Sequence, residues 1–348
     1  MALRLIQVGL GWWGWNWAFE ITRQVPGVEP VAWVDLDPAV RAREIERVGL
    51  PPERVFATLE EACRAVEADA ALLVVPLAAH RALTEAAIGA GLHVLVEKPF
   101  TETLADARDL ARLAAARGRV LMVSQNYRWF PALRHARSLL HDGAIGQLTV
   151  ATLDFAMLYG PGYRYFFLDQ PLLSDMAIHH FDALRYLLQD EPVEVACWSW
   201  NEPGSPFTGN PAALAVIRFA KGTLVSYRGS WIARGPQTDY GGSWRLEGST
   251  GALQFSFRGP GDLRELADRL TLWRGGRQEP VTLPGLALKD RKGVLATFAD
   301  WIAQGQMPED ASSAEDNLMS LALMFAAIRS ARTGGAAVKV RDMLEDDR

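Results

Sequence analysis

A glycine-rich turn follows directly on an apolar run, Leu3 to Val8, and precedes a stretch of helical length, Trp15 to Gln24. The order strand, Gly-x-Gly-x-x-Gly, helix is typical of a nucleotide-binding turn. The glycines allow a tight turn, let the main chain approach a pyrophosphate and let the helix pack on the sheet, while free N–H groups at the helix N-terminus face the phosphates. The sequence therefore predicts a dinucleotide site made by this turn: Gly9, Gly11, Trp12, Trp13 and Gly14.

An acidic residue stands where such a site contacts the adenosine ribose. The apolar run Pro30 to Val34 ends at Asp35, about 20 residues after the last glycine. A carboxylate there accepts hydrogen bonds from the ribose hydroxyls and repels a 2′-phosphate, so the sequence predicts NAD as the cofactor. NADP stays possible, because Arg41 and Arg43 follow on the next predicted helix and could offset the repulsion.

Apolar runs of strand length, separated by stretches of helical length, continue as far as Ser124. Such alternation predicts a Rossmann domain, a doubly wound parallel sheet with helices on both faces. Parallel strands point their carboxyl ends at one edge of the sheet, where open α/β sheets bind ligands. The residues at these strand ends, which we expect beside the cofactor, are Pro76, Glu97, Lys98 and Asn126.

Beyond Gly146 the pattern changes to short strands without intervening helices, separated by turn signals such as Lys221-Gly222. Consecutive strands of this kind predict an α+β domain with a mostly antiparallel, open-faced sheet. A chain of 348 residues is also long for a single core. We therefore expect two domains, residues 1–124 and 125–348, with the C-terminal helices packing back on the first.

One predicted helix interrupts these strands and carries a carboxylate and a histidine at helical spacing. Asp175 and His179 are four residues apart and hence share a helical face, and Asp182 lies on the same side. A carboxylate beside a histidine fixes its tautomer and raises its basicity, which suits a general base for a substrate hydroxyl. A structural interpretation is also open, with Asp175 as an N-cap and His180 as a core or subunit contact.

With these motifs the chain resembles the Gfo/Idh/MocA oxidoreductase family, the group of glucose-fructose oxidoreductase and inositol dehydrogenase. The resemblance runs along essentially the whole chain. A second-domain signature of the family, Asp-x-Gly-x-His-x-x-Asp, matches from Asp175 to Asp182, with Ala177 in place of the usual glycine. The other residues that carry the resemblance are Gly9-x-Gly11-x-x-Gly14, Asp35, Pro76, His80, Ala90 to Pro99, Asn126 to Pro131 and Gly143 to Gly146.

The resemblance implies an active-site role for Lys98, which in the family touches the nicotinamide ribose and the reacting hydroxyl, and a cis Lys98–Pro99 peptide bond. It makes Asp175 and His179 catalytic together with Lys98. It also implies that residues 125–348 bind the substrate and form a homodimer or homotetramer through the open face of their sheet.

Weaker sequence patterns support the remaining candidate residues. His80 starts a predicted helix, where the residues alone favour an exposed or capping histidine, whereas the resemblance groups it with the cofactor-binding residues. The loop from Tyr159 to Tyr165 is aromatic and basic, as polyol sites often are, although a structural Gly-Pro turn is the alternative. The candidate substrate contacts are Lys98, Tyr127, Arg128, Tyr159, Tyr163, Arg164 and His179.

These features predict an NAD-dependent oxidoreductase that transfers a hydride between nicotinamide and a secondary alcohol of a sugar, inositol or sugar derivative. Two alternatives stay open: an NAD-dependent glycoside-cleaving enzyme with transient oxidation, and a non-catalytic NAD(P)-binding regulatory relative. The net charge of -5 argues against a nucleic-acid or anionic-membrane partner. Cys63 and Cys197 match no metal spacing, so no metal is expected. Without a signal-peptide pattern or an apolar run of about 18 residues, the chain is expected in the cytoplasm.

Overall fold

The computed structural model describes residues 2–159, 165–259 and 268–345. By their internal contacts these residues divide into two units, each built from two separate stretches of chain. The first unit comprises Met1–Asn126 and Leu288–Leu318, and the second comprises Tyr127–Ala287 and Met319–Arg348.

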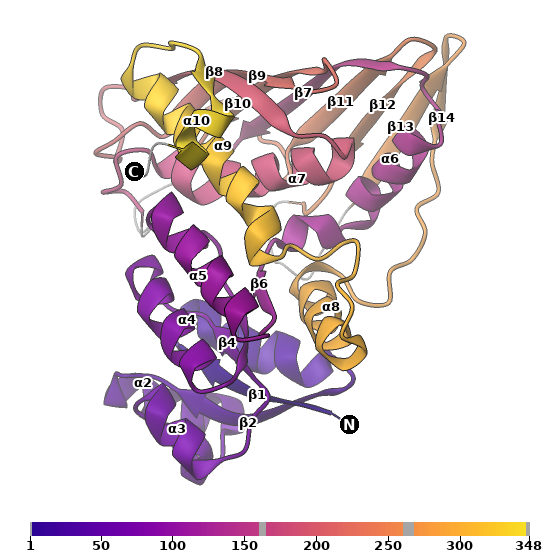
Figure 1. The fold of residues 1–348 in the computed structure, drawn as a ribbon. Coiled ribbons are helices and arrows are strands. Elements are labelled where there is room, and N and C mark those ends of the chain that lie inside the picture. Colours follow the sequence, from indigo (N-terminus) through magenta and orange to yellow (C-terminus); the bar gives the residue numbers. More distant parts are fainter. Residues whose placement is uncertain (1, 160–164, 260–267, 346–348) are drawn as a thin grey trace. The chain divides into compact units, whose positions relative to one another are not determined.

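Among the described residues of the first unit, six parallel strands form one sheet in the order β3-β2-β1-β4-β5-β6. Figure 1 labels β1, β2, β4 and β6 of this sheet. The inner strands are buried nearly throughout, as parallel strands with helices on both faces must be. The doubly wound parallel sheet predicted from the sequence is confirmed. Its strand order reverses between β1 and β4, and a doubly wound sheet binds its ligand at the carboxyl ends of such a pair. The strands are β1 (Leu3–Val8), β2 (Val28–Val34), β3 (Val55–Phe56), β4 (Ala70–Leu73), β5 (His93–Val96) and β6 (Leu121–Val123).

Helices connect these strands, and their starts follow local rules. At the start of α3, Thr58 and Glu61 form a capping box in which each side chain accepts the other residue's backbone N–H. The chain leaves this unit after β6 and later returns, and the backbone N–H of Val123 then donates to the carbonyl of Ser312 at 2.9 Å. The helical elements are α1 (Trp12–Asn16), η1 (Trp17–Ile21), η2 (Thr22–Gln24), α2 (Pro38–Glu44), η3 (Ile45–Gly49), η4 (Pro52–Arg54), α3 (Leu59–Ala65), η5 (Leu77–Ala79), α4 (His80–Gly89), α5 (Leu104–Ala116), α8 (Asp290–Gln304) and the start of α9 (Ala314–Arg332).

The described part of the second unit contains a nine-stranded sheet in the order β14-β13-β12-β11-β7-β10-β9-β8-β15. Neighbouring strands are antiparallel except β10 and β7, so the predicted mostly antiparallel sheet is confirmed. Its strands are β7 (Leu148–Ala156), β8 (Pro192–Trp200), β9 (Ala212–Phe219), β10 (Leu224–Ser230), β11 (Ser243–Gly248), β12 (Gly251–Ser256), β13 (Arg269–Arg274), β14 (Arg277–Pro280) and β15 (Val338–Lys339). Helical elements of this unit are η6 (Asn126–Trp129), which starts at the unit boundary, α6 (Pro131–His141), η7 (Leu172–Ala177), α7 (Ile178–Leu188), the rest of α9 and α10 (Val340–Glu345).

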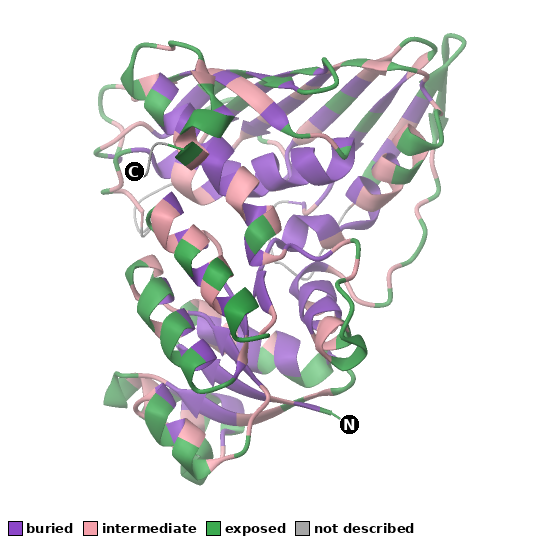
Figure 2. Cartoon of the chain, in the orientation of Figure 1, coloured by how far each residue is buried: buried purple, intermediate pink, exposed green. Residues whose placement is uncertain are grey.

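The two faces of this second sheet differ in burial. Along β9 the side chains alternate, with Ala215 and Ile217 buried and Leu214 and Val216 exposed, as expected of a sheet covered on one face. Figure 2 shows the same alternation in neighbouring strands, whereas every residue of α7 is buried. In the residues that the structure describes, no helix combines the length and the apolar composition needed to cross a membrane.

A buried ion pair fixes α7 within the second unit. Arg128 donates from Nε to Oδ2 of Asp182 at 2.8 Å and from Nη2 to Oδ1 at 2.7 Å. Asp182 is 0% exposed and Arg128 is 4% exposed, and the hydroxyl of Ser320 adds a 3.0 Å hydrogen bond to Asp182. Because a buried carboxylate is costly without its partners, this two-point contact specifies how α7 sits in its unit.

We expect Arg128→Met to lower the free energy of unfolding by about 3–5 kcal/mol, because it leaves the Asp182 carboxylate buried without its counter-ion. The matched control is Arg64→Met, which breaks the exposed pair of Arg64 with Glu60 on α3 and should cost less than about 1 kcal/mol. Urea unfolding followed by circular dichroism measures both. Equal losses in the two variants would contradict the structural role of the buried pair.

Candidate active site

The three glycines of the turn after β1 have three different environments. Gly9 has φ +95°, and a Cβ there would lie 2.1 Å from the carbonyl oxygen of Val74, just beyond β4. A Cβ on Gly14 would lie 2.2 Å from the carbonyl oxygen of Gly9, whereas one on Gly11 would meet nothing within 4 Å. Gly9 and Gly14 therefore let the turn close against β4 and α1, and Gly11 leaves its surroundings open to a ligand.

Asp35 follows β2 and is tied to this turn. Its Oδ2 accepts the backbone N–H of Leu10 at 2.8 Å, and its Oδ1 accepts that of Asp37 at 3.0 Å. Arg41 donates to the backbone carbonyl of Asp35 at 2.6 Å, not to its carboxylate, and Arg43 donates to Glu44 at 2.6 Å. Neither arginine thus neutralises the Asp35 carboxylate through a hydrogen bond. This arrangement fits a ribose with free hydroxyls better than one carrying a 2′-phosphate.

Glu97, at the end of β5, joins the lysine strand end to the helix of the glycine-rich turn. Its Oε1 accepts the indole N–H groups of Trp13 at 2.9 Å and Trp17 at 2.8 Å, and its Oε2 accepts the backbone N–H of Lys98 at 3.2 Å. Glu97 is only 7% exposed, so these N–H groups replace the water that its carboxylate has lost. Within the first unit, Lys98 therefore lies at the same edge of the sheet as the glycine-rich turn.

The Lys98–Pro99 peptide bond is cis, which confirms the expectation from the family resemblance. His80 holds the residues after it. Its Nδ1 lies 2.9 Å from the carbonyl oxygen of Pro99, and its Nε2 lies 3.0 Å from that of Val75. The interpretation of His80 as an exposed or capping histidine is wrong, because its side chain is 1% exposed and reaches inward between two strand ends. Burial lowers the pKa of His80, and the carbonyl contacts of its ring nitrogens oppose that shift.

Two further predicted positions lie at this edge of the sheet. Pro76 is exposed just after β4 and directly precedes η5. Asn126 is 5% exposed, and its side-chain amide donates to the carboxylate of Asp290, the first residue of α8. The next residue, Arg291, places its guanidinium carbon 4.1 Å from the ring centre of Trp13. Sequence reasoning did not single out Asp290 or Arg291, because no local pattern links α8 to residues so far along the chain.

The second unit carries the candidate base on α7. The ring of His179 stacks on Tyr127, with ring centres 4.6 Å apart and planes 15° from parallel. Asp175 lies in the wider turn of η7, not in α7 itself, and the caps of these elements are Pro171 and Ala177. The N-cap interpretation of Asp175 is therefore wrong. Asp175 remains half-buried one helical turn before His179.

Aromatic hydroxyls and one arginine surround the stacked pair. The hydroxyl of Tyr127 accepts from Arg258 at 2.9 Å and donates to the carbonyl of Tyr240 at 3.0 Å. The hydroxyls of Tyr240 and Tyr159 lie 2.9 Å apart. His180 is a core residue: its side chain is 0% exposed, and burial lowers its pKa to about 3. The second unit thus places Tyr127, Tyr159 and His179 near one another. Tyr127 is 0% exposed and His179 is 6% exposed, and a contact of these residues with substrate stays a prediction.

The other substrate candidates differ in how they are placed. Arg128 directs its guanidinium to Asp182 inside the unit and supports the helix of His179. That geometry gives no support to a direct contact between Arg128 and substrate. Tyr163 and Arg164 lie outside the described residues. Within those described residues, no group of three or more His, Cys, Asp or Glu side chains is placed to hold a metal ion.

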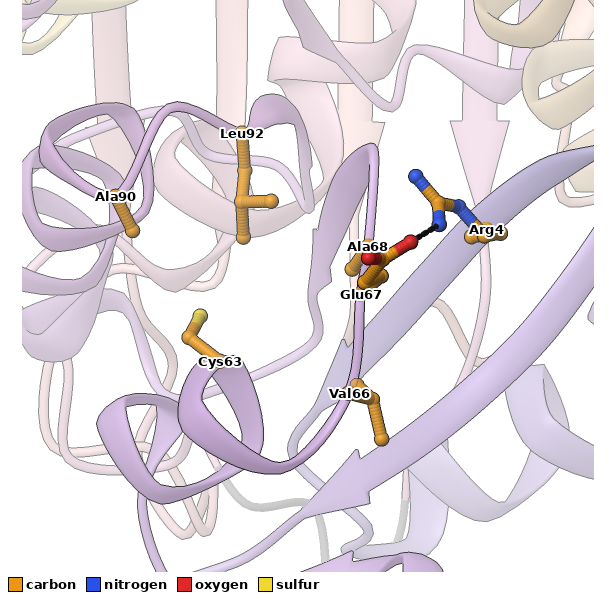
Figure 3. A pocket seen from close by; sticks show the side chains of 7 residues that line it. All are labelled: Arg4, Cys63, Val66, Glu67, Ala68, Ala90 and Leu92. Carbon is orange, nitrogen blue, oxygen red and sulfur yellow. Dashed lines mark hydrogen bonds and ion pairs between the residues drawn. The ribbon is translucent and has the colours of Figure 1, made fainter.

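A pocket of about 430 Å³ opens elsewhere on the first unit (Figure 3). Its lining includes Arg4, near the start of β1, and Leu92, just before β5. Arg4 is bound to Glu67 at 2.6 Å and to Asp69 at 2.8 Å. The pocket therefore lies at the amino ends of the strands, whereas the glycine-rich turn and Lys98 follow their carboxyl ends.

Comparisons with known proteins agree with this geometry. The model of the oxidoreductase family with an NAD-binding Rossmann fold matches residues 3–125, and the model of the GFO/IDH/MocA C-terminal domain matches residues 133–254. The chain is 28% identical to D-apiose dehydrogenase of Paraburkholderia graminis over 345 residues, covering 94% of this chain and 87% of that protein. It is 28% identical to 1,5-anhydro-D-fructose reductase of Ensifer adhaerens over 263 residues, covering 74% and 76%.

Solved structures share the fold. An oxidoreductase from Agrobacterium radiobacter, in complex with NAD+, L-tartaric acid and magnesium, superimposes with a TM-score of 0.87 at 20% identity. The match covers 99% of this chain and 100% of the other. With the family match over residues 3–125, the first unit carries an NAD-binding Rossmann fold.

We expect Gly9→Ala and Gly11→Ala to separate stability from cofactor binding. An alanine at Gly9 clashes with the Val74 carbonyl at a left-handed φ and should cost at least about 2 kcal/mol of unfolding free energy. An alanine at Gly11 has space, so the thermal midpoint should be kept while NADH binding weakens roughly tenfold or more. Differential scanning fluorimetry and NADH fluorescence titration measure the two effects. Loss of stability in Gly11→Ala, with Gly9→Ala unaffected, would reverse the roles of the two glycines.

Proposed function

Because the chain belongs to the Gfo/Idh/MocA oxidoreductase family, we propose that it transfers a hydride between NAD and a secondary alcohol of a sugar, inositol or sugar derivative. The observation that carries this proposal is the Glu97 contact, which ties the Lys98 strand end to the helix of the glycine-rich turn. In our proposal residues 1–124 bind the cofactor, and residues 125–348 bind the substrate and form the oligomer.

The cofactor assignments follow from this edge of the first unit. Gly11 leaves the main chain open to the pyrophosphate, and the Asp35 carboxylate is placed to accept ribose hydroxyls, which favours NAD over NADP. When bound, the nicotinamide ring supplies the carbon that accepts or donates the hydride. His80 and Glu97 act in this proposal by holding the main chain next to Lys98. The complete proposed set is Gly9, Gly11, Trp12, Trp13, Gly14, Asp35, Pro76, His80, Glu97, Lys98 and Asn126.

In the proposed reaction the substrate carbinol loses a hydride from carbon and a proton from oxygen, and becomes a ketone. The imidazole of His179 takes the proton, and Asp175 orients the ring and stabilises the imidazolium. Lys98 donates a hydrogen bond to the same oxygen. Two relatives are named for sugars or sugar derivatives, D-apiose and 1,5-anhydro-D-fructose, which supports this substrate class.

We expect Lys98→Ala and His179→Ala each to lower kcat by roughly 100-fold or more, because each removes a group that handles the proton or its oxygen. NADH binding should persist in both, which fluorescence titration measures. Lys221→Ala and His141→Ala are the matched controls, since Lys221 binds the carbonyl of Gln189 and His141 that of Leu187. Near-normal turnover in both active-site variants would refute the assignment.

We also propose that the exposed face of the second unit's sheet forms a homodimer or part of a homotetramer. Trp198 on β8 is 46% exposed, Leu214 and Val216 on β9 are 40% and 45% exposed, and Leu224 on β10 is 45% exposed. These side chains point away from the buried face of the sheet, and exposed apolar side chains that share one face are typical of subunit interfaces. The partner in this proposal is a second copy of the chain.

A sugar-like substrate, the absence of nucleic-acid and membrane partners, and a cytoplasmic location stay predictions.

The double variant Leu214→Glu with Val216→Glu should be monomeric, because two charges in each copy would be buried at the interface. Light scattering coupled to size-exclusion chromatography measures the mass, and circular dichroism checks the fold. Arg112→Glu, on the exposed side of α5, changes the charge elsewhere and should leave the oligomer intact. An unchanged mass for the double variant would place the interface elsewhere.

A further inference from the structure

Arg258 is a cation close to the stacked pair of Tyr127 and His179, and sequence reasoning did not nominate it. It follows β12 and has φ +54°, a left-handed conformation that is unfavourable for a residue with a side chain. Its carbonyl accepts the backbone N–H of Tyr240 at 2.8 Å, which fixes this conformation. Backbone strain of this kind concentrates at functional sites.

The side chain of Arg258 reaches the ring on which His179 stacks. Its Nη1 donates to the hydroxyl of Tyr127 at 2.9 Å, and its guanidinium carbon lies 5.4 Å from the centre of the Tyr127 ring. That ring centre is 4.6 Å from the centre of the His179 ring. The Arg258 guanidinium carbon therefore lies no more than about 10 Å from the centre of the His179 ring. A five- or six-carbon sugar chain can cover this distance.

The charge of Arg258 acts on the groups around it. Burial is the main cause of the lowered pKa of His180, and the Arg258 charge lowers that pKa further. Burial and the hydrogen bond to Tyr240 raise the pKa of Tyr159, which Asp175 raises further and Arg258 opposes. In the proposed reaction His179 must gain a proton, and a cation close to it disfavours that gain. The Asp175 carboxylate offsets part of this repulsion, and an anionic group on the substrate would offset more of it.

We infer that the substrate carries a carboxylate, as an aldonic or uronic acid does, and that Arg258 is the residue that selects it. This inference rests on the proposed hydride transfer and names its substrate class. A guanidinium matches a carboxylate in shape and charge and forms stronger hydrogen bonds with it than with a neutral hydroxyl. The Tyr159 and Tyr240 hydroxyls beside it suit the remaining hydroxyls of a sugar.

The test is a panel of aldonates and uronates, each paired with its neutral parent sugar and the corresponding sugar phosphate, assayed for NAD+ reduction. For the wild-type enzyme, at least one acid should exceed its neutral parent and the phosphate tenfold or more in kcat/KM. Arg258→Met should lower that acid-to-neutral ratio at least tenfold, mainly through KM, and Arg258→Lys should restore part of it. Arg277→Met, which removes the same charge from the exposed strand β14, should leave the ratio unchanged.

Calorimetric binding of the same acids to the enzyme loaded with NADH provides a readout that needs no turnover. Acids that bind in an Arg258-dependent way without reducing NAD+ would uphold the inference on the ligand and refute the proposed function. Turnover of neutral sugars with no preference for their acids would uphold the proposed function and refute the inference on the ligand. A preference for the phosphate, or an equal loss for acid and neutral sugar in Arg258→Met, would overturn the role of Arg258, and so would the absence of both binding and turnover.

Discussion

The first unit depends on one buried carboxylate that is satisfied by N–H groups. Glu97 receives the indole N–H groups of Trp13 and Trp17 and the backbone N–H of Lys98, so a helix and a strand end are held by the two oxygens of one carboxyl group. Hydrogen bonds to an ionised acceptor are stronger than those between neutral groups, and their loss in a buried site is costly. Any displacement of the glycine-rich turn's helix therefore also acts on the main chain that carries Lys98.

In the second unit a buried ion pair, and not a single carboxylate, holds the functional helix in place. Its helix α7 is buried on every side, so the position of His179 depends on contacts made by its neighbours. Arg128 and Ser320 bind Asp182 three residues further along, and Tyr127, next to Arg128 in the chain, stacks on the His179 ring. Tyr127 orients the His179 ring and Arg128 anchors α7, so both tasks fall to consecutive residues of one short segment. This explains why the position of the candidate base depends on a segment that has no obvious catalytic group.

Local patterns predicted the parallel sheet, the glycine-rich turn, the antiparallel sheet and the helix of His179, because these depend on periodicity and turn residues near in sequence. The family resemblance predicted the cis Lys98–Pro99 bond. The sequence did not predict which side chains contact one another. Trp13 and Glu97 are 84 residues apart, and Tyr127 and Arg258 are 131 apart. The position of His80 at a helix start suggested exposure, whereas carbonyl groups 19 and 20 residues away draw its ring inward. The wider turn of η7 likewise has no marker among its residues.

The return of the chain to the first unit has a consequence for synthesis on the ribosome. One edge of strand β6 is covered only by the later segment around Ser312, and the side chain of Asn126 has its partner in the later residue Asp290. Both partners emerge only after the strands from β7 to β14 have been translated. Until then the nascent first unit carries an open strand edge, which is the feature of a sheet most prone to pair with foreign chains. The order of the elements along the chain, and not only the final fold, therefore sets how long this strand edge stays open during synthesis.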